Sequence, residues 1–295
     1  MSDVDFNESS YLAANPDVAD ALKVGQFESG YQHYQSFGKG ENRKLDLNGK
    51  MSREDKALFQ LDKNGIGLEI GPSHNPIAPK KKGFNVHILD HLNAKELRKK
   101  YEAHDVNIEN IEEVDFVWSG ETLPELTGAR SYYDWIIASH VIEHVPDLVS
   151  FLQQCAELLK PDGKLSLIIP DKRYCFDYFN PPSTTGEILD AFEAKRTRPS
   201  VGKVFDHVAN ACKRGGNIAW DDETIGELEL IHTNDMAQSL WQQAQNSKDY
   251  IDVHCWRFIP ESFQLILADL NILGLIDFTI LKEGGFKSEV QHLDY

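Results

Sequence analysis

Cysteine is scarce and scattered in this chain of 295 residues. None of its four cysteines, Cys155, Cys175, Cys212 and Cys255, forms the CxxC pair that is typical of zinc and redox sites. We therefore expect free, buried thiols. Long apolar runs are also missing, because none approaches the ~20 residues that a membrane-spanning helix requires. The sequence thus predicts no membrane insertion.

Positive charge is in deficit. The chain has 30 Lys and Arg against 47 Asp and Glu, a net charge of -17. Such a surface repels nucleic acid, whose binding depends on Lys and Arg releasing counterions, so no nucleic-acid partner is expected. The one tight basic group, at 80–82 with Lys95 and 98–100 nearby, is interpreted as solvated surface. The amino terminus lacks the basic and apolar stretches of a secretory signal, and we expect a cytoplasmic protein.

The length allows one large core and a small appendage, because single cores extend to roughly 250 residues. Residues 6–45 predict two or three short helices, separated by glycines and by a turn at Asn15-Pro16. We place a small helical module at 1–48 and a catalytic domain at 49–295. The aromatic residues expected to form the miniature core of the module are Phe6, Tyr11, Phe27, Tyr31, Tyr34 and Phe37.

From Ile66 onward, short apolar runs alternate with helical stretches, which is typical of a parallel sheet with crossover helices. The segment at 146–163 predicts an amphipathic helix that is ended by Pro161 and Gly163. Residues 171–257 lack good strands and predict a helical insertion over the active site. A helix at 260–270 precedes a final hairpin, so we expect a doubly wound, mostly parallel, Rossmann-like α/β sheet of seven strands with an antiparallel C-terminal strand. The predicted strands are 66–70, 85–89, 114–117, 134–138, 164–169, 277–281 and 288–293.

The turn after the first strand and the end of the second strand predict a nucleoside site. Gly71 directly follows the buried strand and lets the backbone come close to a ligand at the carboxyl edge of the sheet. Asp90 ends the next strand 19 residues later, the separation at which a carboxylate meets the ribose hydroxyls. An ordinary strand-to-helix turn is the alternative.

This turn lacks the glycines of a dinucleotide site. Ser73 and Asn75 stand where GxGxxG would place glycines, and Pro76 interrupts the turn, so a pyrophosphate is not expected. A nucleoside that carries an amino acid fits better. Glu69 would then organise either the turn or the ammonium group of the ligand.

Three segments in the expected order resemble class I S-adenosylmethionine-dependent methyltransferases. They are LEIGPSHNP, ILDH and DWIIASHVIEHVPDLVSFLQQCAELLKPDGKLSLIIPD, between Gly67 and Asp171. The sequence departs from the family pattern in one respect, because the second and third glycines of the first motif are missing. This difference affects the contacts that the loop would make with the donor, not the fold. The resemblance implies S-adenosylmethionine as donor and S-adenosylhomocysteine as product. The cofactor-binding residues that it implies are Glu69, Gly71, Pro72, Ser73, Asp90, His91, Trp118, Ser119, Ser139 and His140. For Trp118, a hydrophobic cap on the sheet edge is the alternative to a contact with adenine.

The segment from His140 to His144 matches the HxxEH signature of a zinc-peptidase class. Zinc would need both histidines on one helical face with a third ligand, whereas this motif follows a strand end. We interpret the match as coincidence and expect no metal. Methyl transfer is an in-line displacement that needs alignment and a base, so His144, His140 and His207 are the catalytic candidates. A hydrogen bond from His144 to a loop carbonyl is the alternative.

The predicted insertion supplies the candidates for acceptor binding, namely Asp171, Arg173, Tyr174, His207 and His254. Asp206, His207 and His254 leave room for a divalent ion, but their spacing is not compact, and none is expected. The alternative is that these polar residues, taken singly, have structural roles.

The expected function is methyl transfer to an oxygen, with nitrogen as the less favoured acceptor atom, of a small molecule or saccharide. A saccharide acceptor would indicate glycan biosynthesis. The sugar acceptor follows from YLAANPDVA and HYQSFG, which resemble a short module of bacterial glycosyltransferases and cell-surface proteins, and from the acidic, His-rich insertion. The alternatives are a non-catalytic module that binds S-adenosylmethionine or glycan, and an NAD-dependent enzyme, which the missing glycines disfavour. The oligomeric state is not indicated.

Overall fold

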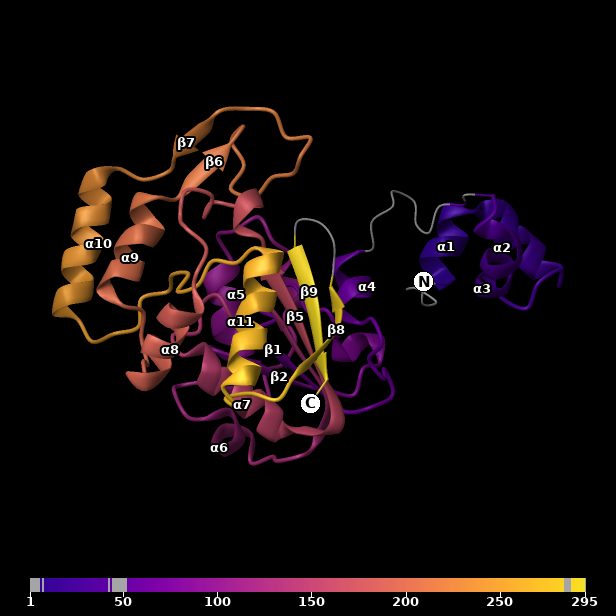
Figure 1. The fold of residues 1–295 in the computed structure, drawn as a ribbon, viewed down its shortest axis with the longest axis horizontal. Coiled ribbons are helices and arrows are strands. Elements are labelled where there is room, and N and C mark those ends of the chain that lie inside the picture. The colour runs from indigo at the N-terminus through magenta and orange to yellow at the C-terminus, as the bar shows by residue number, and fades with distance from the viewer. Residues whose placement is uncertain (1–5, 7, 42, 44–51, 284–287, 295) are drawn as a thin grey trace. The chain divides into compact units, whose positions relative to one another are not determined.

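The computed structural model describes residues 6, 8–41, 43, 52–283 and 288–294 (Figure 1). The chain forms two compact units, Met1–Phe59 and Gln60–Tyr295, and each is described by itself. The boundary predicted after residue 48 lies outside the described residues. Among the described residues, no helix combines the length and the apolar character needed to cross a lipid bilayer. All four cysteines are free and buried, as expected.

The first unit contains the predicted short helices. Asn15 occupies the N-cap position of the second helix, so the predicted Asn-Pro turn is a helix start, where a proline in the first turn is favoured. The elements are α1 (Glu8–Ala14), α2 (Pro16–Lys23), α3 (Gly30–His33), a π-helical turn (Tyr34–Gly38) and α4 (Arg53–Ala57).

Tyr11 is the centre of the aromatic core in this unit. Its ring is buried against those of Phe6 and Tyr34, at centroid distances of 4.7 and 5.5 Å, and its hydroxyl is 2.9 Å from Nδ1 of buried His33. Two residues predicted for the core, Tyr31 and Phe37, are 39% and 52% exposed. They lie at its rim, because so small a unit cannot enclose six rings.

The second unit is built on a seven-stranded sheet in the order β3-β2-β1-β4-β5-β9-β8. β1 to β5 are parallel, and β9 runs antiparallel to both β5 and β8, which confirms the predicted mostly parallel sheet and its final antiparallel strand. The strands are β1 (Gly67–Ile70), β2 (Val86–Asp90), β3 (Phe116–Val117), β4 (Tyr133–Ser139), β5 (Leu159–Pro170), β8 (Thr279–Glu283) and β9 (Ser288–Asp294).

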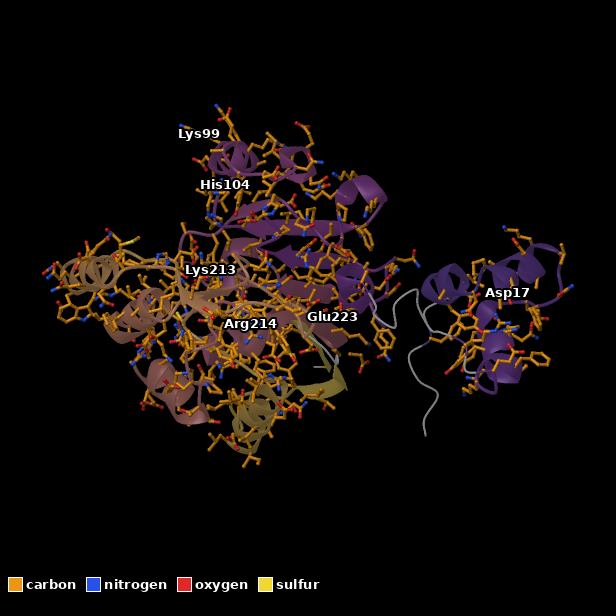
Figure 2. The ribbon with its side chains drawn as sticks, turned by 90° about the horizontal axis from the view of Figure 1, so that it is seen from above. Asp17, Lys99, His104, Lys213, Arg214 and Glu223 are labelled. Atoms are coloured by element: carbon orange, nitrogen blue, oxygen red, sulfur yellow. The ribbon has the colours of Figure 1, made fainter. Side chains whose placement is uncertain are left out.

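Helices cover both faces of this sheet. Figures 1 and 2 show α5 and α11 on opposite sides of it, the arrangement expected for a doubly wound fold. α7 and α11 share the main core with β1, β4 and β5. The helices are α5 (Ala94–Tyr101), α6 (Leu123–Thr127), α7 (Leu148–Leu158) and α11 (Pro260–Ile272), with 3₁₀ turns at Lys80–Lys82, Ile108–Asn110 and Lys172–Tyr174.

The end of α7 corrects one prediction. The helix starts after Asp147, whose carboxylate accepts a hydrogen bond from Ser150 N at 3.0 Å, and it ends at Leu158 instead of at Pro161. Leu159 pairs with Tyr133 in the sheet, so β5 begins there. Leu159 was assigned to the helix because an apolar residue at this position also continues the apolar face of the helix.

The predicted insertion is helical in part. It contains α8 (Thr185–Glu193), α9 (Val201–Ala209) and α10 (Asn234–Asn246), but also an antiparallel pair of strands, β6 (Cys212–Arg214) and β7 (Leu228–Leu230) (Figure 1). Lys213 and Arg214 on β6 are labelled in Figure 2. The sequence analysis missed this pair because strands of three residues leave no readable alternation.

Gly67 on β1 lies opposite Trp135 on the neighbouring strand β4. A Cβ atom added there would lie 2.1 Å from the ring of Trp135, which is fully buried and donates a hydrogen bond from Nε1 to Asp62 O. We expect Gly67→Ala to lower the free energy of unfolding by ~1–3 kcal/mol through overpacking, measured by urea denaturation.

Gly202→Ala in α9 is the matched control, since nothing lies within 4 Å of its added Cβ. It should be neutral or stabilising by up to ~1 kcal/mol, because alanine favours helix. Equal urea midpoints for the two variants would contradict the packing explanation.

Candidate functional site

The residues predicted to bind the donor lie at one edge of the sheet. β3, β2, β1, β4 and β5 are parallel neighbours, so their carboxyl ends face the same side, where open α/β sheets bind ligands. Each predicted group follows the end of one of these strands. They are Gly71, Pro72 and Ser73 after β1, Asp90 and His91 at β2, Trp118 and Ser119 after β3, and Ser139 and His140 at β4. Asp171, which was predicted to bind the acceptor, follows β5.

The turn after β1 has an unusual backbone. Gly71 has φ +66°, and a Cβ atom there would lie 2.9 Å from Cγ2 of Val141 in the loop after β4. Ser73 also has a positive φ, 51°, which is uncommon for a residue with a side chain and is frequent at functional sites. Its Oγ is buried without a hydrogen-bond partner in the structure, so this hydroxyl is available to a ligand.

Glu69 organises the loop that follows this turn. Its buried carboxylate accepts hydrogen bonds from Ile77 N at 2.7 Å and from Ala78 N at 3.0 Å. Of the two roles left open by the sequence, these bonds support the organisation of the turn.

Asp90 contacts the turn directly. The residue is 2% exposed, and Oδ2 accepts a hydrogen bond from Ser73 N at 2.9 Å. Oδ1 lies 2.8 Å from His91 N and 2.6 Å from His91 Nδ1. A carboxylate can accept about four hydrogen bonds, so one position remains for a ribose hydroxyl, and movement of the His91 ring would free a second.

The residues after β3 are held by Glu121. Trp118 donates from Nε1 to Glu121 O at 2.7 Å, and Ser119 donates from Oγ to the Glu121 carboxylate at 2.8 Å. The indole of Trp118 also packs against the main core. This packing supports its role as a cap on the sheet edge, and its contact with adenine stays a prediction.

The HxxEH segment forms a turn after β4 and does not lie on a helix. His140 has φ 54°, is half exposed, and places Nδ1 3.5 Å from Glu143 Oε1. His144 Nδ1 is 2.8 Å from Asp252 Oδ1, so its partner is a carboxylate and not the carbonyl considered above. Burial by itself would lower the pKa of His144, but this hydrogen bond and the charge of Glu143 raise it above its usual value. The two histidines therefore do not form the paired face of a zinc peptidase.

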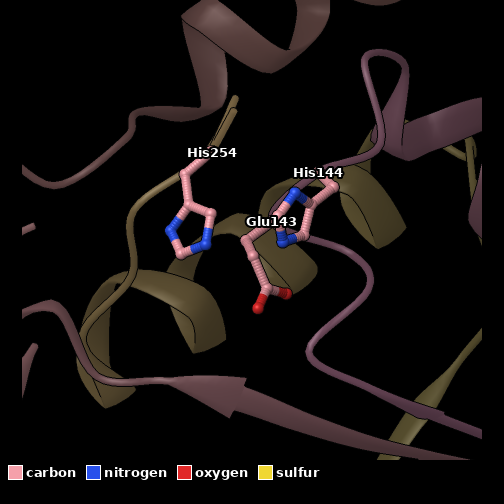
Figure 3. A group of neighbouring side chains, drawn as sticks. All are labelled: Glu143, His144 and His254. Atoms are coloured by element: carbon pink, nitrogen blue, oxygen red, sulfur yellow. The ribbon is translucent and has the colours of Figure 1, made fainter. Parts of the chain in front are cut away.

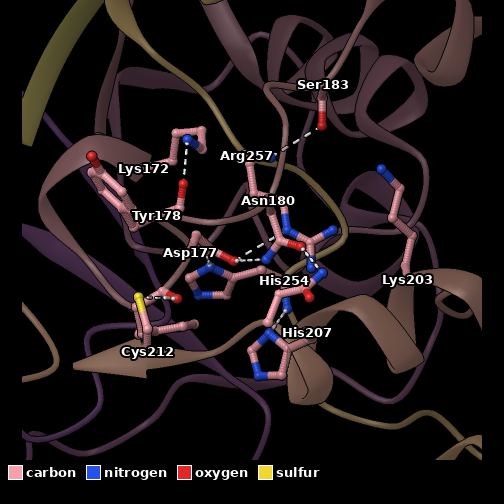
Figure 4. Close-up of polar contacts among 12 residues, drawn as sticks. Lys172, Asp177, Tyr178, Asn180, Ser183, Lys203, His207, Cys212, His254 and Arg257 are labelled. Carbon is pink, nitrogen blue, oxygen red and sulfur yellow. Dashed lines mark hydrogen bonds and ion pairs between the residues drawn. The ribbon is translucent and has the colours of Figure 1, made fainter. Parts of the chain in front are cut away.

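His254 connects this turn to a buried ionic network in the insertion (Figure 4). Asp177 lies 2.5 Å from His254 Nδ1 and 3.1 Å from Arg257 Nε, and all three side chains are buried. Burial would raise the pKa of Asp177, but the hydrogen bond and charge of His254 and the charge of Arg257 lower it to about 2. Asp177 was not predicted as a site residue, because 77 residues separate it from His254 and no motif joins them.

A second group of side chains meets at the other side of His254. Ligand atoms of Glu143, His144 and His254 all lie within 4.8 Å of one another (Figure 3). The HxxEH motif contains the first two of these residues. His254 was predicted to bind the acceptor, and a divalent ion was considered for it only together with Asp206 and His207.

The acceptor candidates largely bind one another. Asp171 is buried and accepts hydrogen bonds from Arg173 Nε at 3.0 Å, while the guanidinium of Arg173 stays partly exposed. A hydrogen bond to Asp222 raises the pKa of Tyr174. Burial lowers the pKa of His207 to about 4, and its Nδ1 accepts a hydrogen bond from His254 N at 3.1 Å. His207 is therefore neutral at pH 7, with its accepting nitrogen already engaged.

A family model described as a methyltransferase domain matches residues 43–271, well over half of the chain. Residues 1–42 lie outside this range, and no comparison supports the expected likeness of that part to glycosyltransferase modules.

Two curated relatives match over short segments. A highly reducing polyketide synthase of Aspergillus nomiae is 34% identical over 92 residues, which are 30% of this chain and 4% of that protein. A mitochondrial ubiquinone biosynthesis O-methyltransferase of Bos taurus is 48% identical over 40 residues, 14% of this chain and 11% of that protein. The chain thus covers only a small part of the length of these relatives.

Solved structures with a similar chain path are more distant. A putative zinc-dependent alcohol dehydrogenase from Rhodobacter sphaeroides has a TM-score of 0.46 at 12% identity, with 84% of this chain and 91% of that chain covered. An S-adenosylmethionine-dependent methyltransferase from Aquifex aeolicus has a TM-score of 0.41 at 9% identity, with 82% and 89% covered. Scores this low support no functional conclusion.

Proposed function

The chain belongs to the methyltransferase domain family, and from this we propose that it methylates an oxygen of a small molecule or saccharide. It is an S-adenosylmethionine-dependent methyltransferase. The observation that carries the site assignment is the contact between Asp90, at the end of β2, and Ser73, in the turn after the adjacent strand β1. This contact puts a carboxylate and a close-approach turn where a nucleoside with an amino-acid tail would be bound.

We assign donor binding to this edge on the following grounds. Asp90 would accept hydrogen bonds from the ribose hydroxyls, and the buried Ser73 Oγ is a hydrogen-bonding group without a protein partner. Gly71 keeps the backbone free of a side chain at the point of closest approach. When bound, S-adenosylmethionine supplies a methyl group activated by a sulfonium charge.

The reaction requires alignment and removal of one proton. As the acceptor oxygen forms a bond to the methyl carbon, the carbon-sulfur bond breaks, the sulfonium becomes a neutral thioether, and the hydroxyl proton goes to a base. Of the three predicted bases, we favour His140, because it is half exposed at the carboxyl end of β4 and Glu143 lies beside it. His207 Nδ1 accepts a hydrogen bond from the backbone of His254, and His144 Nδ1 is engaged with Asp252, so only Nε2 of His144 is available as a base.

The choice of oxygen and of a saccharide rests on the resemblance of the N-terminal module and on the acidic, His-rich insertion. The test is product formation with methyl-labelled S-adenosylmethionine and a panel of sugars and small hydroxylated or amino compounds. We expect labelled product with a hydroxylated acceptor.

Calorimetry with the two candidate cofactors distinguishes the classes of function. We expect binding of S-adenosylmethionine and none of NAD, because the turn lacks the glycines that cradle a pyrophosphate. Binding without turnover on the whole panel would favour the non-catalytic alternative, and NAD binding would contradict the proposed family of reactions.

A further inference from the structure

We propose that Glu143, His144 and His254 form a binding site for a divalent transition-metal ion. The inference goes beyond the sequence analysis, which expected no metal. Glu143 and His144 belong to the turn after β4, whereas His254 approaches from the end of the insertion (Figure 3). Two imidazoles and one carboxylate are ligands of zinc and of other first-row divalent ions.

The ligand atoms are close to binding distance. Those of the three side chains lie within 4.8 Å of one another. Metal–ligand bonds of about 2.0–2.2 Å keep any two ligand atoms within about 4.4 Å, so small side-chain rotations suffice to close the site. In Figure 3 the stem of Glu143 lies between the two imidazole rings, and its carboxylate lies below them in this view.

Glu143 is the observation that points to a ligand. Its side chain is fully buried, and neither carboxylate oxygen has a hydrogen-bond partner. An ionised carboxylate removed from water without hydrogen bonds is costly unless a cation compensates it. The nearest ion-pair distance, 3.5 Å from Oε1 to His140 Nδ1, is too long for a good hydrogen bond.

Both histidines are oriented as metal ligands usually are. His144 Nδ1 bonds to Asp252 and His254 Nδ1 bonds to Asp177, so each ring presents Nε2 to the site. A carboxylate on the opposite nitrogen fixes the tautomer and makes the ligating nitrogen more basic. The structure therefore contains the outer carboxylates that a metal site needs, as well as the ligands.

The charge of the surroundings suits a divalent cation. Glu143, Asp177 and Asp252 carry three negative charges. Arg257, which is paired with Asp177, carries one positive charge. As metal ligands both histidines would be neutral, so two negative charges would remain. A bound M²⁺ would neutralise them, and three protein ligands would leave a coordination position for water or for an acceptor oxygen.

The function of this ion rests on the proposed methyl transfer. An acceptor hydroxyl bound to the open position would have a lowered pKa and a fixed oxygen, which aids attack on the methyl carbon. Metal binding itself requires neither donor nor acceptor.

The test uses the full chain after dialysis against a chelator, titrated with Co²⁺ alone and followed by visible absorption and calorimetry. We expect about one equivalent bound. Glu143→Gln and His254→Ala should weaken binding more than ~100-fold, and Asp252→Asn about 10–100-fold, as for outer-shell carboxylates elsewhere. His104→Ala removes an exposed histidine beyond α5 (Figure 2) and should leave the affinity unchanged.

Two further measurements keep the result interpretable. Glu143→Gln keeps the side-chain volume, so a cooperative thermal transition together with lost Co²⁺ binding would support the site even if His254→Ala does not fold. S-adenosylmethionine affinity measured in the same variants separates this inference from the proposed function. Absence of Co²⁺ binding to the natural chain, or equal binding by Glu143→Gln, would overturn the proposal and leave protonated histidines as the partners of Glu143.

Discussion

Asp90→Ala is expected to weaken S-adenosylmethionine binding by at least ~10-fold in calorimetry, because it removes a charged hydrogen-bond acceptor from the ribose position. The expectation depends on the buried carboxylate that joins the turn after β1 to the end of β2. The same change removes the acceptor for Ser73 N. The turn would then lose part of its fixed geometry, and both effects act in the same direction.

Asp90→Asn separates these contributions. The amide oxygen can still accept the hydrogen bond from Ser73 N, but the negative charge is gone, so we expect an intermediate loss of affinity. Thermal unfolding of both variants checks that the fold survives. An unchanged affinity in a folded Asp90→Ala protein would place the donor site elsewhere.

Asp177→Asn is expected to lower the free energy of unfolding by ~3–5 kcal/mol, the typical cost of leaving a buried ion without its partner. Asp177 is 1% exposed and Arg257 is 3% exposed, and Arg257 Nη2 already lacks a hydrogen-bond partner. Without the carboxylate, the guanidinium would remain buried and uncompensated. Urea denaturation with a chelator present measures the effect without a contribution from bound metal.

Glu229→Gln is the control, because it breaks an exposed ion pair in the same insertion. Lys213 and Glu229 lie 3.2 Å apart across β6 and β7, with 60% of the glutamate side chain exposed. Such pairs contribute ~0–1 kcal/mol. A loss of similar size in both variants would mean that the buried network is not what holds this part of the insertion.

The sheet could be predicted because its strands are separate apolar runs that alternate with helical stretches. The predictions of helices and strands were wrong where the local pattern is weak or fits both a helix and a strand. Leu159 is buried in β5, and the same apolar residue suited the helix that precedes it. β6 and β7 have three residues each, too few for alternation to appear.

The donor edge was predictable for a geometric reason. Gly71 and Asp90 follow parallel neighbouring strands, and such strand ends must lie together. The network around His254 was not predictable in the same way. Asp252 pairs with His144 across 108 residues of sequence, and Asp177 pairs with His254 across 77 residues. Only tertiary packing creates these pairs.

The place of β9 between β5 and β8 constrains how the chain folds during synthesis. β8 is made first, yet it pairs with β9 and not with β5. Until residues 288–294 emerge from the ribosome, the backbone groups of β5 on that side have no strand to pair with, and such an open edge can capture another chain. Stalled or truncated translation products that lack this segment would therefore be especially prone to aggregation.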